Sequence, residues 1–135
     1  MKNLVYIIAM GVILTSCASN NKDDDFSPSS DSRDKYVAYW NESANSAVAG
    51  TNTHTVNIIK STTNSTEIII NNFSGLSVSA RASINNNNLT IPYQQIGTIG
   101  FTQGSGTFSN SNAITLTYTT TIATSRDSSQ TTYSK

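Results

Sequence analysis

The chain has 135 residues, of which 12% are charged, and its eight basic and eight acidic side chains give a formal net charge of zero. Without a cluster of Lys or Arg it lacks the electrostatic footprint of nucleic-acid binding, so we expect no nucleic-acid partner. The length suits one domain with one core, and the single cysteine cannot form an internal disulfide.

The start of the chain indicates export. Lys2 supplies a positive charge, and residues 4–14 form an apolar run that has the length of a signal peptide and is too short to span a bilayer. The tetrapeptide LTSC at 14–17 then resembles the lipobox of bacterial lipoproteins at each position. This resemblance implies that residues 1–16 are a lipoprotein signal peptide and that Cys17 carries acyl chains such as palmitate. The alternative is an ordinary secretory signal followed by a stray free thiol.

Residues 17–34 form an acidic segment rich in Ser and Asn, which cannot bury enough apolar surface to fold, so we expect a flexible tether. Within it, Lys22, Asp23, Asp24 and Asp25 resemble the surface-export signal of Bacteroidota-type lipoproteins, in which acidic residues follow a Lys or Ser close to the lipidated cysteine. The resemblance implies an outer-membrane lipoprotein that faces the cell surface. Two alternatives stay open: a merely solubilising tether, and a calcium site, for which a fold would have to arrange the ligands.

Residues 35–135 show the period-two alternation of β-strands. In residues 76–84 and 114–122, apolar residues alternate with Ser, Thr or Arg, which predicts one buried and one wetted face. Segments rich in Asn, Ser and Gly separate the alternating runs, and no sustained helical period occurs after residue 17. The expected strands are residues 36–42, 53–60, 66–71, 76–84, 89–93, 97–108, 114–122 and 130–133.

About eight short antiparallel strands predict an all-β up-and-down barrel, with a β-sandwich as the alternative. Closure favours the barrel, because it removes unpaired sheet edges. The segment RDKYVAYW at 33–40 resembles the first-strand signature of lipocalin-like domains, an aromatic residue and a Gly-x-Trp triplet; Trp40 matches the Trp and Ala38 replaces the glycine. Residues 67–73, 88–92, 104–107 and 113–118 also resemble small lipocalin-like lipoproteins of the same bacteria.

The lipocalin-like resemblance implies a barrel whose mouth or interior binds something small and apolar. An eight-stranded barrel is, however, only just wide enough for its own side chains, so we expect most inward residues to form a core. Trp40 is expected to plug the barrel floor, with its indole N–H bonded to a backbone carbonyl. The candidate ligand-binding residues are Tyr36, Trp40, Tyr93, Phe108 and Tyr118. The expected inward residues are Trp40, Val56, Ile58, Ile68, Ile70, Leu76, Val78, Leu89, Ile91, Ile99, Phe101, Leu116, Tyr118 and Tyr133.

Catalytic chemistry has few candidates in this sequence. His54, the only histidine, lies between two Thr residues, which indicates a solvated or edge position. Glu42 and Glu67 are a conceivable glycosidase-like pair. There is no Gly-x-Ser-x-Gly elbow, and we expect residues 104–106 to form a turn or a bulge. The sequence also lacks clustered zinc ligands and a phosphate-binding glycine loop. We therefore expect no enzyme activity, no metal and no cofactor.

Two functions stay open for a protein held to the membrane through Cys17. The first is a binding module for a small apolar or glycan ligand, whose sign would be an unfilled apolar pocket near the candidate aromatic rings. The second is a structural or interaction lipoprotein with a filled barrel, which would bind an outer-membrane or other protein partner through its outer surface. The sign of this second function would be a packed interior with an exposed apolar patch.

Overall fold

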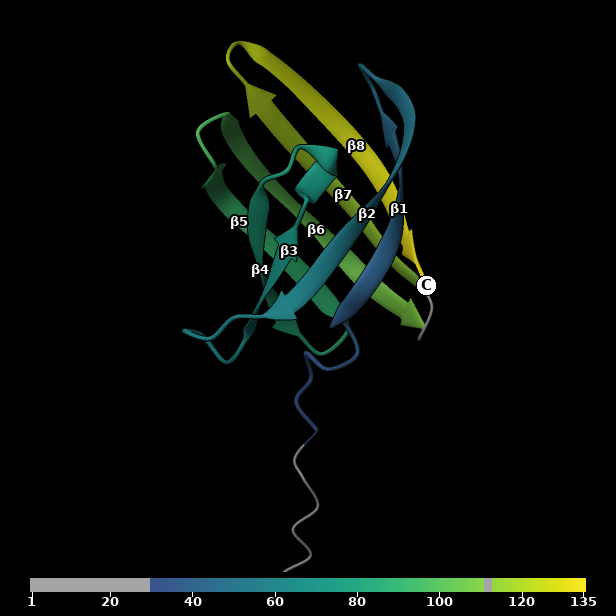
Figure 1. Cartoon of the computed structure of the whole chain (residues 1–135), viewed down its shortest axis with the longest axis vertical. Coiled ribbons are helices and arrows are strands. Elements are labelled where there is room, and N and C mark those ends of the chain that lie inside the picture. Colours follow the sequence, from purple (N-terminus) through teal and green to yellow (C-terminus); the bar gives the residue numbers. More distant parts are fainter. Residues whose placement is uncertain (1–29, 111–112) are drawn as a thin grey trace, which may run out of the picture.

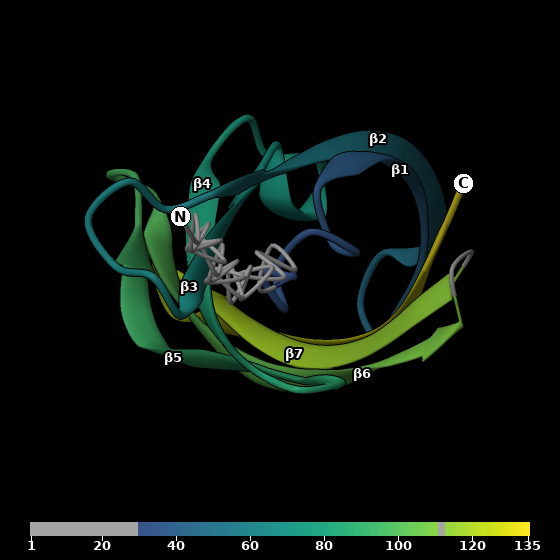
Figure 2. The ribbon, with the colours of Figure 1, turned by 90° about the horizontal axis from the view of Figure 1, so that it is seen from below.

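Eight antiparallel strands follow one another in chain order around a closed barrel in the computed structural model, which describes residues 30–110 and 113–135 (Figure 1). The strands are β1 (Ala38–Ser46), β2 (Gly50–Lys60), β3 (Glu67–Asn71), β4 (Ser79–Asn85), β5 (Asn88–Ile96), β6 (Gly100–Asn110), β7 (Ala113–Ile122) and β8 (Ser125–Ser134). β8 pairs with β1 and closes the ring, as the view along the barrel shows (Figure 2). The predicted up-and-down barrel is confirmed, and the sandwich alternative is excluded.

The only helical element in the described part of the chain is the single 3-10 turn η1 (Phe73–Gly75), between β3 and β4. No helix there is long and apolar enough to cross a membrane. The expectations for the signal peptide, for Cys17 and for the export segment 22–25 fall outside the described residues.

Two hairpin turns are tighter than the sequence suggested. β1 continues to Ser46, whose hydroxyl oxygen accepts hydrogen bonds from the N–H groups of Val48 and Ala49, and the positive φ of Gly50 (75°) starts β2. The turn before β8 is shorter still, so β8 begins at Ser125 and its polar first half pairs with β7. Pairing with a neighbouring strand therefore outweighs the polar, turn-like composition of these segments.

β5 contains Pro92 and continues to Ile96, beyond residue 93, where the sequence predicted its end. The register between β5 and β6 shifts between Ile91 and Gln94, and such a bulge tolerates a residue without an N–H group. The side-chain amide of Gln94 then bonds the backbone of Arg81, accepting from its N–H at 2.9 Å and donating to its carbonyl oxygen at 2.6 Å. This amide replaces the missing backbone pairing between β4 and β5.

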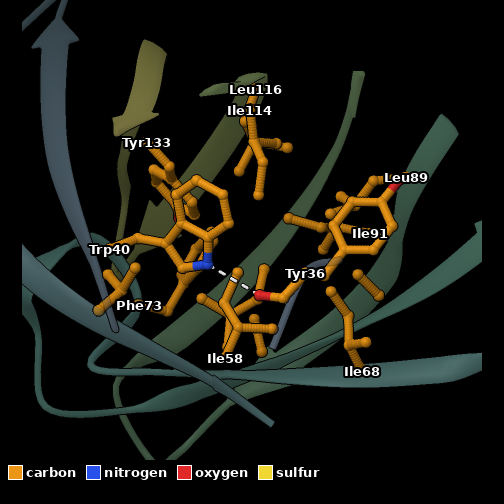
Figure 3. Packing of buried hydrophobic residues seen from close by; sticks show 14 of the residues in the cluster. Tyr36, Trp40, Ile58, Ile68, Phe73, Leu89, Ile91, Ile114, Leu116 and Tyr133 are labelled. Carbon is orange, nitrogen blue, oxygen red and sulfur yellow. Dashed lines mark hydrogen bonds between the residues drawn. The ribbon is translucent and has the colours of Figure 1, made fainter. Parts of the chain in front are cut away.

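Buried apolar side chains pack together inside the barrel, and Tyr36 and Trp40 belong to this cluster at the end where β1 begins (Figure 3). Trp40 is fully buried, and its indole N–H donates to the carbonyl oxygen of Tyr36 at 2.8 Å, as predicted for a floor plug. The ring of Phe108 meets Tyr36 edge-on at 5.2 Å between centroids and Trp40 at 6.3 Å. Three of the expected inward residues, Leu76, Ile99 and Phe101, are instead 37–40% exposed.

The segment before β1 seals this filled end. The buried guanidinium of Arg33 donates to the carbonyl oxygens of Ser61, Asn64 and Glu67 at 3.0–3.2 Å, and it forms an ion pair with Asp31 at 2.7 Å. These bonds tie residues 31–36 to the loop between β2 and β3. The barrel therefore has one closed end, and the chain enters β1 from that end.

β6 carries glycines where the inner wall is crowded. Gly104 pairs with Tyr118 in regular register, so residues 104–106 are continuous strand rather than a turn or a bulge. A Cβ atom at Gly104 would lie 2.6 Å from Cβ of Tyr118 and 2.5 Å from the carbonyl oxygen of Thr117. Glycine is needed here because neighbouring atoms occupy the space of a side chain.

We predict that Gly104→Ala destabilises the barrel by about 1–3 kcal/mol, the usual cost of overpacking a filled interior. The neighbouring substitution Ser105→Ala, on the exposed outer face, should change the free energy of unfolding by less than about 0.5 kcal/mol. Urea denaturation followed by the fluorescence of Trp40 measures both. Equal effects of the two substitutions would show that the inner wall has room at Gly104.

Candidate functional site

Along β1, β7 and β8, the inward side chains change from large near the closed end to small toward the opposite end. The inward residues of β1 are Trp40, Glu42, Ala44 and Ser46, so side chains become smaller and more polar toward the turn between β1 and β2. β8 shows the same trend, because its inward residues Tyr133, Thr131 and Ser129 follow one another from the closed end to the opposite end. Small side chains cannot fill the barrel at that opposite end, which we call the mouth.

A pocket of about 290 Å³ opens at the mouth. Its inner wall includes Ala44, Ser46, His54, Ser74, Thr120 and Ser129. Its rim carries the apolar side chains of Val48, Leu76 and Ile122, which are 37–69% exposed. The pocket therefore combines a polar wall with an apolar entrance.

Glu42 is the central charged group of the interior. Its side chain is fully buried, and its Oε2 lies 2.6 Å from Nε2 of His54, which lines the pocket. The imidazole N–H is not aligned on this oxygen, so the contact is close without being a linear hydrogen bond. Burial raises the pKa of Glu42, and the nearby His54 and the Tyr118 hydroxyl offset part of that rise.

Two tyrosines surround the buried carboxyl group. The hydroxyl of Tyr118 lies 3.1 Å from Oε1 of Glu42, to which it donates, and 2.9 Å from Oγ of Ser74. The hydroxyl of Tyr133 is buried and has no hydrogen-bond partner within the described residues. Burial and the charge of Glu42 raise the pKa of both phenols, so both stay neutral at physiological pH.

The loop around η1 holds one wall of the pocket. Asn72 fixes this loop, because its side-chain N–H donates to the carbonyl oxygen of Thr55 and its side-chain oxygen accepts from the N–H of Ser77. The loop inserts the ring of Phe73 into the core, 4.7 Å from the ring of Tyr118, and places Ser74 at the pocket. A substitution in this loop would therefore change both the core and the pocket wall.

A second carboxylate lies at the rim. Asp127 on β8 bonds the hydroxyl of Ser46 and accepts from the N–H of Val48 at 3.1 Å. The pocket lining contains this carboxylate and one histidine but no Lys or Arg. The field in the mouth therefore disfavours anionic molecules.

The candidate aromatic residues do not gather at one site. Tyr36, Trp40 and Phe108 belong to the packed core at the closed end, with at most 8% of each side chain exposed. Tyr118 lies beneath the mouth pocket, and Tyr93 is 69% exposed on the outside of the barrel. The pocket thus opens away from most of the rings that the sequence singled out.

The acidic and histidine candidates also lie differently from the expectation. His54 does not have a solvated edge position but faces inward against Glu42. Glu67 lies on the outer side of β3, where its neighbours Ile68 and Ile70 point into the core, so Glu42 and Glu67 are on opposite sides of the barrel wall. The period-two alternation that starts at Trp40 places Glu42 on the inner face. This alternation in the sequence could therefore have predicted that Glu42 is buried.

The site has few catalytic parts. A carboxyl group beside an imidazole can exchange a proton, but none of the hydrogen bonds within the described residues joins His54 to a serine hydroxyl, as a hydrolytic triad would require. The same residues contain no group of three metal-ligating side chains. The described residues at this end form a pocket with a largely polar inner wall, and Glu42 is buried behind His54.

Comparison with known proteins adds no relative: no family model matches the chain, and no curated protein matches its sequence.

We predict that Glu42→Gln flattens the pH dependence of stability. Because burial raises the pKa of Glu42 in the folded state, its favourable contribution is complete below the unfolded value of about 4.3 and is lost as pH rises through the folded pKa. The Gln variant still accepts from Tyr118 but does not titrate, so it should be the more stable protein at neutral pH.

Urea unfolding of wild type and Glu42→Gln between pH 4 and pH 8 measures this effect, with the outward-facing Glu67→Gln as the matched control. Parallel stability curves for wild type and Glu42→Gln would contradict a buried carboxyl group with a raised pKa.

Proposed function

We propose that this protein is a lipid-anchored, surface-displayed outer-membrane lipoprotein that binds a small, non-anionic, largely apolar molecule at the barrel mouth without catalysing a reaction. The observation that carries this proposal is the uneven filling of the barrel. The rings of Tyr36, Trp40 and Phe108 pack the closed end, whereas the opposite end contains a pocket of about 290 Å³ with an apolar rim.

The size and lining of the pocket define the class of ligand. Small-molecule sites usually enclose about 300–1,000 Å³, so this pocket suits a molecule at the small end of that range. Val48, Leu76 and Ile122 offer apolar contact, and the hydroxyls and the imidazole of the inner wall offer hydrogen bonds. Asp127 at the rim and Glu42 behind His54 argue against a fatty acid or another anion.

The position of the mouth fits display on a surface. Residues 31–36 lie against the closed end of the barrel, and the mouth lies at the other end (Figure 1). An anchor at Cys17 would therefore join the domain at its closed end and leave the mouth facing away from the membrane. Two or three acyl chains on Cys17 would hold the protein essentially permanently, whereas one would bind only marginally.

An exposed apolar rim also supports a second function, the docking of a protein partner. Val48 and Ile122 lie in different hairpins at the mouth, and Leu76 lies beside η1, so the apolar side chains surround the opening from several sides. A partner that inserts one apolar side chain into the pocket would cover this rim. The mass of whatever is bound distinguishes this function from the first.

Native mass spectrometry of the full chain, extracted from its own envelope in mild detergent, tests the binding proposal. We expect a bound small molecule that Ile122→Glu removes by placing a charge on the rim. The control is Ile59→Glu, a matched substitution of an Ile that is 40% exposed on the outside of β2. A bare wild-type protein, or an adduct that survives Ile122→Glu, would contradict binding at the mouth.

Cell fractionation tests the anchor and the display. Cys17→Ala should move the protein from the membrane fraction to the soluble fraction, because the acyl chains are its only proposed attachment. Replacing Asp23, Asp24 and Asp25 by Ala should leave it in the membrane fraction but protect it from protease added to whole cells. An unchanged membrane fraction in Cys17→Ala would contradict the lipid anchor.

A further inference from the structure

A wide hollow lies on the outside of the barrel. A shallow groove of about 840 Å³ crosses β5, β6, β7, β8 and β1. It is lined mainly by outward-facing Ser, Thr, Asn and Gln, and none of its lining residues is charged. No part of this groove belongs to the mouth pocket.

The groove contains two neighbouring rows of polar side chains, which the strand register aligns across five strands. The first row consists of Thr90, Ser105, Thr117, Gln130 and Asn45. The second row consists of Asn88, Thr107, Thr115, Thr132 and Ser43. With neighbouring strands about 4.8 Å apart, each row extends for about 19 Å.

These side chains are free to bind. All ten residues are exposed, and the hydrogen bonds of the described residues engage only one of their side chains, the hydroxyl of Thr115, which donates to the carbonyl oxygen of Thr107. The rows therefore present hydroxyl and amide groups, which both donate and accept, at regular intervals.

An aromatic surface adjoins the rows. The rings of Tyr93 and Phe101 stack in parallel, with centroids 5.3 Å apart and planes within 2°. Tyr93 is 69% exposed, so one of its faces stays open although the other covers Phe101. Two smaller depressions, which share Tyr93, Gln103 and Thr119, continue from this pair to Ser105 and Thr117 in the first row.

We propose that this outer groove binds a linear, uncharged polysaccharide chain, with a sugar ring on the open face of Tyr93. Sugar hydroxyls both donate and accept hydrogen bonds, as do the groups in the two rows, and the C–H face of a sugar ring packs on an aromatic ring. Polyanions and phosphate groups fit poorly, because none of the residues that line the groove is charged. An apolar protein surface fits poorly as well, since the rows lack large apolar side chains.

Calorimetric titration of the full chain tests this proposal. The probes are linear hexasaccharides of β-1,4-glucose, α-1,4-glucose, β-1,3-glucose, β-1,4-mannose and β-1,4-xylose, and the detergent carries no sugar headgroup. We expect at least one of them to bind. Thr117→Arg, in the middle of the first row, and Tyr93→Ala should each weaken that binding about tenfold or more.

Matched control variants distinguish binding in the groove from binding elsewhere on the surface. Thr55→Arg changes an exposed Thr on β2 outside the groove and should leave the affinity within about twofold. Ile122→Glu at the mouth should also leave it unchanged, so this test is independent of the mouth ligand. The emission of buried Trp40 verifies that each variant is folded.

Three results would overturn the proposal: no hexasaccharide binds, only a charged control such as hexagalacturonate binds, or Thr117→Arg and Thr55→Arg have equal effects.

Discussion

The pairing of β1 with β8 determines what the rest of this structure can do. Six residue pairs, from Asn41↔Ser134 to Ser46↔Ser129, close the sheet, and closure divides every strand into an inner and an outer face. An eight-stranded ring leaves little more than the width of its own side chains, so large inward residues fill it and small ones leave it hollow. The two proposed binding sites therefore lie at the hollow end and on the outer wall.

The inner face combines stability and binding along one axis. At the closed end, Trp40, Tyr36 and Phe108 pack edge to face, and the indole N–H is satisfied by a backbone carbonyl. Near the mouth, Glu42 lies buried beside His54 and Tyr118, and such a carboxyl group costs stability unless its partners or a proton compensate it. The polar cluster therefore separates a rigid core from a pocket that water or a ligand can enter.

Sequence periodicity predicted the fold better than it predicted the site. Alternation and turn residues predicted the class and most strands. The choice of a closed barrel and the role of Trp40 as a plug also depended on the removal of sheet edges and on the lipocalin-like resemblance. The strand ends were missed where Ser46 caps a turn and where Pro92 is accommodated by a bulge, because both depend on contacts with other strands. The contact between Glu42 and His54 joins β1 and β2, and no pattern within either segment predicts how these two strands align. Likewise, the two rows on the outer face could not be predicted from the sequence, because they depend on how five strands align.

We infer that the barrel is solid at its closed end, so that ligands reach only the mouth or the outer groove. The indole N–H resonance of Trp40 tests it most directly, because the chain has one tryptophan and therefore one such signal. The structure predicts slow hydrogen exchange at this N–H and an unchanged chemical shift when envelope extract or hexasaccharide is added, while resonances of the mouth or of the groove move. Rapid exchange, or a Trp40 signal that shifts most of all, would show that the interior is open and would contradict the claim.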